Sequence, residues 1–216
     1  MLCARASGDA LLCEACAAAM PRCERTCPRC ALATPDGSTC GRCLSVPPPF
    51  DAACAAWIYA FPADRLMRAF KYGGRLALAE PLARALADAV LGRGTPLPDC
   101  LCAMPLGPLR QRHRGFNQAQ EIARRVAEQV RLPLRAALVR TRETPAQAGL
   151  SLRERARHVR DAFRATEPLQ GLAVAIVDDV MTSGATLAAA ARAARAAGAV
   201  RVEAWVVART PKGSEP

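Results

Sequence analysis

The segment that most constrains the fold is AVAIVDDVMTSGATL, residues 173–187. Its first five residues are apolar, and an alanine-rich run follows its polar loop. A short apolar run is typical of a buried strand, whereas alanine favours helix. The sequence therefore predicts a strand over 173–177 that turns at Asp178 and Asp179 and enters a helix near Ala185. In an open α/β sheet, this end of a strand borders the ligand crevice.

The predicted turn carries groups that suit a phosphorylated sugar. Thr182, Ser183, Gly184 and Thr186 supply hydroxyls, backbone N–H groups and close backbone approach at a helix start, which together make a phosphate cradle. Two adjacent carboxylates would repel a phosphate, so they must face something else. Sugar hydroxyls or a bridging Mg²⁺ fit that position.

The chain is long enough for one sizeable domain with a small appendage, at 216 residues of which 51% are hydrophobic. Its formal charge is +11, and the stretch from Arg110 to Arg164 holds 14 arginines against 5 acidic residues. A field of that sign favours phosphates on a nucleotide sugar, on nucleic acid or on an acidic partner. The chain shows no long apolar run and no basic-then-apolar leader, so we expect a cytoplasmic protein without membrane insertion.

Eight of the eleven cysteines precede residue 44, which in a cytosolic chain favours metal binding over disulfides. Two C-x-x-C hooks, Cys27 with Cys30 and Cys40 with Cys43, are separated by nine residues. Paired thiolates at this spacing complete a tetrahedral Zn²⁺ site. We therefore expect one structural zinc ion here, whose binding would fold a segment poor in apolar residues.

An earlier set of cysteines is incomplete. Cys13 and Cys16 form a third hook, but Cys3 is followed three residues later by an alanine. A second zinc site would use these three cysteines with either Cys23 or water as the fourth ligand, and a degraded site is the alternative. The other cysteines lie in strand-like apolar contexts and are expected to be buried small hydrophobes: Cys54, Cys100 and Cys102.

The proline run at 47–49 divides the chain into a predicted cysteine-rich region, 1–46, and a second domain, 50–216. Hydrophobic spacing in the second domain predicts strands over 52–59, 101–104, 173–177 and 200–208, and helices over 64–72, 80–91, 117–130 and from about 185. Alternating strands and helices indicate a parallel or mixed sheet. The predicted fold class is therefore α/β.

Several motifs together resemble a known family. Residues 176–186 closely resemble the 5-phosphoribosyl-1-pyrophosphate (PRPP) motif of type I phosphoribosyltransferases. A Walker B strand also ends in acids, but the chain has no G-x-x-x-x-G-K-[ST] motif to accompany one. With the cysteine hooks, residues 70–75 (FKYGGR), 114–119 (RGFNQA), 144–150 (TPAQAGL) and 155–163 resemble the ComF family over nearly the whole chain. Two positions depart from its pattern, Ala6 for a cysteine and His158 for an asparagine.

The resemblance implies a type I phosphoribosyltransferase core, a mainly parallel sheet flanked by helices, with zinc-ribbon elements in front of it. It implies that Asp178 and Asp179 hold the ribose hydroxyls of PRPP. The loop from Thr182 to Thr186, including Ser183, Gly184 and Ala185, would surround the 5-phosphate.

The resemblance also implies a place for the pyrophosphate group. Pro105 and Leu106, in the turn after the first core strand, would line it. Arg112 and Arg114 are assigned by position to the loop that closes over it, and Lys71 could also reach it.

Two functions are open at this point. In the first, the protein transfers phosphoribosyl from PRPP to an unknown nitrogen acceptor, and Mg²⁺ and arginines stabilise the departing pyrophosphate. In the second, it is a non-catalytic accessory protein whose basic surface contacts single-stranded DNA or a competence partner, as the family's association with DNA uptake implies. An amidotransferase nucleophile among the cysteines is rejected, because thiolates bound to structural zinc are not free to attack.

Overall fold

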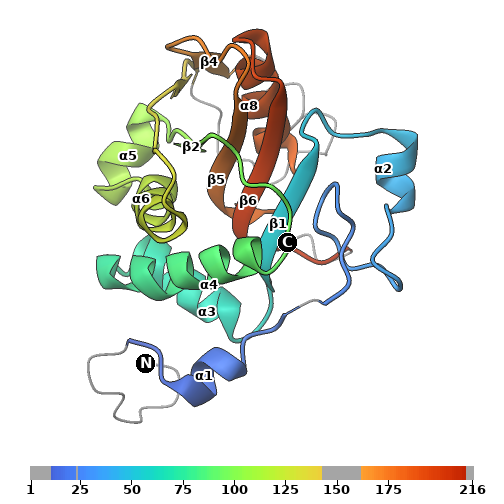
Figure 1. The fold of residues 1–216 in the computed structure, drawn as a ribbon. Helices are drawn as coiled ribbons and strands as arrows, with labels where there is room; N and C mark the ends of the chain where they lie inside the picture. Colours follow the sequence, from blue (N-terminus) through green and yellow to red (C-terminus); the bar gives the residue numbers. More distant parts are fainter. Residues whose placement is uncertain (1–10, 23, 143–161, 213–216) are drawn as a thin grey trace.

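Four parallel strands form the central sheet of the computed structural model, in the order β1-β6-β5-β2 (Figure 1). The structure describes residues 11–22, 24–142 and 162–212. The strands are β1 (Ala52–Ile58), β2 (Cys100–Ala103), β5 (Ala173–Met181) and β6 (Arg201–Arg209). The two central strands, β5 and β6, consist mostly of buried apolar residues, as expected where helices cover both faces of the sheet. The predicted α/β class with a parallel sheet is confirmed.

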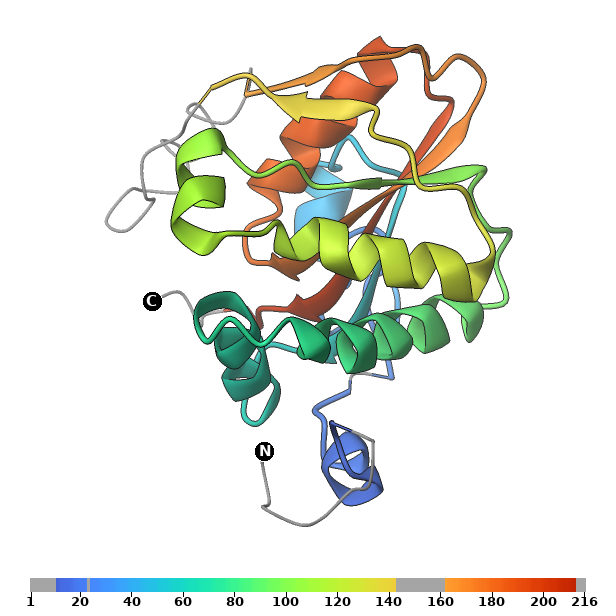
Figure 2. The ribbon, with the colours of Figure 1, turned by 90° about the vertical axis from the view of Figure 1, so that its left-hand side faces the viewer.

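Helices lie on both faces of this sheet. α4 (Ala79–Leu91) and α6 (Gln118–Val130) run side by side across one face, and α8 (Ala185–Ala196) packs on the other (Figure 2). The 3-10 turn η1 (Leu76–Leu78) joins α3 (Ala63–Tyr72) to α4. Among the described residues, no helix combines the length and apolar character needed to cross a membrane.

Three features differ from the sequence prediction or extend it. The strand predicted over 173–177 continues through both acids to Met181, because the nine-residue β6 supplies paired backbone as far as Arg209. Backbone pairing with a long neighbour thus overrides the low strand preference of aspartate. A short helix, α5 (Pro108–Arg114), and an antiparallel pair, β3 (Leu138–Arg140) with β4 (Phe163–Ala165), were not predicted.

The cysteine-rich segment packs against the outer edge of β1. The backbone N–H of Ile58 donates to the carbonyl of Pro21 at 2.7 Å, and that of Ala53 donates to Pro28 at 2.9 Å. These bonds cover an edge strand that would otherwise expose unpaired backbone groups. Met20 and Ala31 are buried in the same core as the sheet. The short helices α1 (Glu14–Ala18) and α2 (Gly41–Ser45) belong to this segment, and the division at the prolines stays a prediction.

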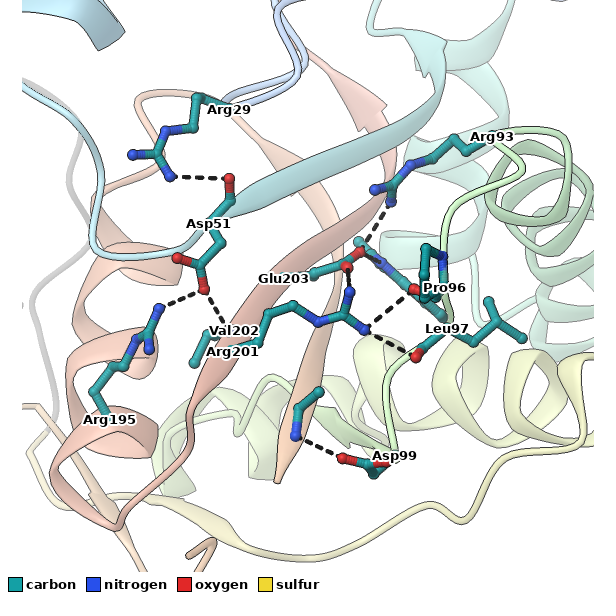
Figure 3. A network of polar contacts seen from close by, with 12 residues as sticks. Arg29, Asp51, Arg93, Pro96, Leu97, Asp99, Arg195, Arg201, Val202 and Glu203 are labelled. Atoms are coloured by element: carbon teal, nitrogen blue, oxygen red, sulfur yellow. Dashed lines mark hydrogen bonds and ion pairs between the residues drawn. The ribbon is translucent and has the colours of Figure 1, made fainter. Parts of the chain in front are cut away.

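A polar network closes the edge of the sheet where the strands begin (Figure 3). Glu203, which is 3% exposed, accepts from Arg93 at 2.9 Å and from the indole N–H of Trp205 at 2.9 Å, and it pairs with Arg201 at 3.5 Å. Asp51 accepts from the backbone N–H of Val202 at 2.8 Å. These charges at this edge are thus paired within the protein.

Candidate functional site

The two acids of β5 lie near its carboxyl end, inside the strand. Asp179 is 8% exposed, and Asp178 is half-buried. The Nζ of Lys71, near the end of α3, lies 3.0 Å from Oδ2 of Asp179. The backbone N–H of Asp179 donates to Oδ1 of Asp178 at 2.8 Å. The site therefore holds two neighbouring carboxyl groups against a single close ammonium.

This crowding changes how the groups titrate. Burial, followed by the charge of Asp179, raises the pKa of Asp178 to about 7. Burial opposes the charge on Lys71, but the carboxylates of Asp179 and Asp178 outweigh it and raise the Lys71 pKa above its ordinary value. Lys71 is therefore a cation at neutral pH, while Asp178 gains or loses its proton there. Perturbed groups of this kind gather at functional sites.

Both acids open onto a cavity of about 210 Å³ at the carboxyl edge of the sheet. Its lining joins the end of β5, the turn after β2, α3, α5 and the starts of α6 and α8. Seven of its residues carry a positive charge, an amide or a hydroxyl: Lys71, Arg110, Arg114, Asn117, Gln118, Arg140 and Thr186. A mixed lining of this kind suits an anionic ligand that carries hydroxyl groups.

The structure brings together most, but not all, of the residues predicted to hold PRPP. Those that line the cavity are Asp178, Asp179, Thr186, Pro105, Leu106, Arg114 and Lys71. Ser183, Gly184 and Ala185 line a neighbouring cavity of about 260 Å³ beside the cysteine cluster, and Thr182 is exposed.

Arg112 is exposed and does not line the cavity, whereas Arg110 does. The reason is helical geometry. Positions 110 and 114 are four residues apart in α5 and share one face, but position 112 lies about 200° around the helix from each of them. The sequence would have indicated that positions 110 and 114 face the cavity together, and that position 112 does not, if a helix had been predicted there.

Two further residues line the cavity that were not predicted as ligands, Asn117 and Arg140. Asn117 begins α6 by accepting the backbone N–H of Ala119 at 3.0 Å, and its amide donates to the carbonyl of Met104 at 3.1 Å. It thus fixes the turn after β2 against α6. Arg140 reaches the cavity from β3, and its guanidinium stacks over the ring of Phe163 at 5.3 Å. No sequence pattern places β3 beside the acids.

The loop between β5 and α8 has the backbone shape expected of an anion cradle. Gly184 has a φ of +80°, which only glycine adopts without strain, and it begins a twelve-residue helix. The hydroxyl of Ser183 accepts the backbone N–H of Ala185 at 3.3 Å. The first N–H groups of α8 have no carbonyl partner within the helix, so they can bind an anion.

Four cysteines form a candidate metal centre. The Sγ atoms of Cys27, Cys30, Cys40 and Cys43 all lie within 4.8 Å of one another, with 3.7 Å between those of Cys30 and Cys40. A tetrahedral site with Zn–S bonds near 2.3 Å places its sulfurs about 3.8 Å apart, so the geometry fits zinc. The backbone N–H of Cys40 donates to Cys27 Sγ at 3.4 Å, as expected where a thiolate accepts hydrogen bonds. This confirms the predicted grouping of four cysteines.

The other predicted metal ligands do not join this cluster in the described chain. Cys16 is buried in α1 and Cys13 precedes that helix. Cys3, Ala6 and Cys23 lie outside the described residues, as do 144–150 and His158. A second site therefore stays a prediction. The three remaining cysteines are buried as expected, at 6%, 1% and 0% exposure: Cys54, Cys100 and Cys102.

Comparisons with known proteins show the family of this chain. Residues 107–216 match the family described as "Phosphoribosyl transferase domain". The "DNA utilization protein YhgH" of Salmonella typhi is 37% identical over 205 residues, which cover 92% of this chain and 90% of the relative. "Competence protein F" of Haemophilus influenzae is 30% identical over 178 residues, which cover 79% of this chain and 78% of the relative.

A solved structure, the glutamine PRPP amidotransferase of B. subtilis with ADP and GMP, aligns with 65% of this chain and 30% of its own. The TM-score is 0.44 and the identity 19%. The assignment depends on the family match and on the curated relatives, which cover most of the chain. This protein therefore belongs to the ComF/YhgH family of phosphoribosyltransferase-domain proteins.

Proposed function

We propose that this protein binds PRPP with Mg²⁺ in the cavity beside Asp178 and Asp179, and transfers its phosphoribosyl group to an unidentified nitrogen acceptor with release of pyrophosphate. One observation carries the proposal. Two carboxyl groups, an ammonium, three arginines and the start of α8 converge on one cavity at the carboxyl edge of a parallel sheet. That edge is where open α/β sheets bind their ligands.

Each end of PRPP has chemically suitable groups. The carboxylates of Asp178 and Asp179 accept hydrogen bonds from the ribose hydroxyls, which donate them. The 5-phosphate lies at the start of α8, within reach of the Thr186 hydroxyl and first-turn N–H groups. The pyrophosphate lies along Pro105 and Leu106, where Arg110 and Arg114 reach it.

The Lys71 ammonium has two roles in this scheme. Without ligand it neutralises Asp179 at 3.0 Å, which allows two acids to stand side by side. With ligand it stays within reach of the pyrophosphate, because it lines the same cavity as Arg110 and Arg114. It therefore offsets repulsion between the acids and the phosphates of the ligand.

Transfer breaks the bond between the anomeric carbon and the pyrophosphate oxygen and forms a bond from that carbon to the acceptor nitrogen. Positive charge builds up on the ribose as the bond breaks, and the protein holds both reacting parts in position. Carboxylate oxygens suit Mg²⁺, which would supply charge neutralisation at the pyrophosphate. Arg110 and Arg114 stabilise the same departing group through charge-assisted hydrogen bonds.

The test of PRPP binding is calorimetry with Mg²⁺ and PRPP on the wild type and on the double variant Asp178→Asn with Asp179→Asn. We expect micromolar binding by the wild type and at least about a hundredfold loss in the variant, because the ribose loses both charged acceptors. Glu128→Gln is the matched control: it removes one carboxylate from α6, where the side chain is 62% exposed. Equal binding by the double variant would rule the site out.

A second function is supported by the names of the relatives and by the charge of +11. The protein would then contact single-stranded DNA or a competence partner through its basic surface. Backbone contacts release counterions, so DNA affinity should fall log-linearly with salt concentration. Binding of a labelled oligonucleotide between about 50 and 200 mM NaCl tests this function, and a flat salt response would exclude phosphate-backbone contacts.

A further inference from the structure

A buried arginine links the cysteine cluster to the loop proposed to hold the 5-phosphate. Arg209, at the end of β6, is 5% exposed. Its Nε donates to the carbonyl of Cys30 at 2.9 Å. Its Nη1 donates to the carbonyls of Met181, at 2.8 Å, and of Thr182. One guanidinium thus joins a cysteine of the metal centre to two successive peptide groups at the start of the loop.

A second arginine reaches the next peptide of the same loop. Arg42 lies inside the second hook, between Cys40 and Cys43, and its Nη2 donates to the carbonyl of Ser183 at 3.1 Å. Two arginines therefore bind three successive carbonyls, those of Met181, Thr182 and Ser183. Arg42 belongs to the cysteine segment, and Arg209 is hydrogen-bonded to it through the Cys30 carbonyl.

These bonds also determine where the loop's N–H groups point. In a trans peptide the carbonyl and the following N–H point in opposite directions. Fixing the three carbonyls toward Arg209 and Arg42 therefore aims the N–H groups of Thr182, Ser183 and Gly184 away from these two arginines. Successive N–H groups held on one side form an anion-binding concavity.

We propose that the four-cysteine segment positions the phosphate loop, residues 182–186. Arg42 and Arg209 are the positioning residues, because their hydrogen bonds join this segment to the loop. The inference rests on the proposed PRPP site and adds a dependence of that site on metal occupancy. Four thiolates around zinc fix the separation of the two hooks, and hence the places of the Cys30 carbonyl and the Arg42 side chain. Loss of the metal frees the hooks to separate, which releases the Ser183 carbonyl from Arg42 and removes the Cys30 carbonyl that holds the Arg209 guanidinium in place.

The first test requires no ligand. Backbone ¹⁵N order parameters are measured for Ser183 and Gly184 in the zinc-loaded full-length protein, in Arg42→Ala, and after removal of zinc by a chelator. We expect values near 0.85 in the wild type and below about 0.6 in the other two samples, while the amides of 174–177 remain rigid in all three. Equal order parameters for the loop in all samples would overturn the proposal.

Arg29→Ala is the matched control for Arg42→Ala. Arg29 occupies the same place in the first hook, but its guanidinium donates to the carbonyl of Asp51 at 3.0 Å instead of to the loop (Figure 3). Arg42 is exposed, so Arg42→Ala should fold, whereas Arg209→Ala would leave several buried carbonyls without a donor. Zinc content measured by mass spectrometry should stay at the wild-type value in both hook variants.

The second test separates the two ends of the ligand. Arg42→Ala should weaken binding of ribose 5-phosphate about fivefold, because the loop must be ordered on binding. Binding of pyrophosphate with Mg²⁺ should not change, since its proposed contacts come from α5 and the turn after β2. Arg29→Ala should change neither. Equal weakening of both ligands would indicate general damage and contradict the positioning role.

The outcomes distinguish this inference from the proposed function. A wild-type protein that binds neither probe disproves the PRPP site, while the order parameters still decide whether the cysteine segment holds the loop. Normal PRPP binding together with a loop unaffected by Arg42→Ala and by zinc removal disproves the positioning role and leaves the proposed function standing.

Discussion

At the scale of a single residue, Asp178 is a binding-site group whose ionisation lowers the stability of the folded protein. Burial, followed by the charge of Asp179, raises its pKa from 3.8 to about 7. The folded state therefore holds this proton more tightly than the unfolded chain does. The contribution of Asp178 to stability is favourable below about pH 4 and is lost as the pH rises toward 7.

We therefore predict that Asp178→Asn raises the melting temperature relative to the wild type at pH 8, by at least about 2 °C, and that this gain shrinks toward pH 5. The same change should weaken PRPP binding, by less than the double variant with Asp179→Asn does. Thermal unfolding between pH 5 and 8 checks the first part, and calorimetry checks the second. A gain in melting temperature that does not depend on pH would contradict the assigned titration.

At the scale of elements, the start of α8 depends on the backbone conformation of one glycine. Gly184 has a φ of +80°, and a Cβ there would meet the Met181 sulfur at 3.4 Å. An alanine in this conformation costs roughly 1–2 kcal/mol. We predict that Gly184→Ala lowers the melting temperature by about 2–4 °C for each kcal/mol lost and also weakens ribose 5-phosphate binding. Thermal unfolding and calorimetry measure the two effects.

Gly171 provides the control for this prediction. It too has a positive φ, +74°, has open space where a Cβ would lie, and is found before the start of β5, away from the cavity. Gly171→Ala should therefore reduce stability by a similar amount without changing ligand binding. If both variants bound ribose 5-phosphate like the wild type, the loop would not be the phosphate cradle.

At the scale of the whole molecule, the two edges of the sheet have different roles: one stabilises the fold, and the other carries the candidate site. The edge where the strands begin pairs its charges internally, with Glu203 held by Arg93 and Arg201 (Figure 3). We predict that Glu203→Gln costs roughly 2 kcal/mol of unfolding free energy. This is below the roughly 3–5 kcal/mol of a fully buried pair, because both arginines reach water. PRPP affinity should not change.

Urea unfolding and calorimetry test this separation. Glu167→Gln is the surface counterpart, since Glu167 pairs with Arg135 at 2.8 Å with both side chains at least 33% exposed, and it should cost less than about 1 kcal/mol. Loss of PRPP affinity in Glu203→Gln would show that the two edges are coupled.

The sequence by itself determined the class of fold, the strand that leads into the acids but not its full length, the helix after them, and the four cysteines of the metal centre. Each of these depends on local spacing: apolar runs, helix formers and C-x-x-C hooks act within a few residues of one another. The helix over 117–130 was predictable for the same reason, because an asparagine cap and apolar periodicity are both local.

Only the tertiary structure decided which charges meet. Lys71 of α3 forms an ion pair with Asp179 of β5. Arg140 reaches the cavity from a strand that was not predicted, and Arg209 connects Cys30 to the loop after β5. These pairs are far apart in sequence, and an arginine beside a phosphate looks the same in sequence as one that is solvated. Parallel strands place their carboxyl ends at one edge of the sheet, and packing of α3, β3 and the cysteine segment brings these side chains to that edge.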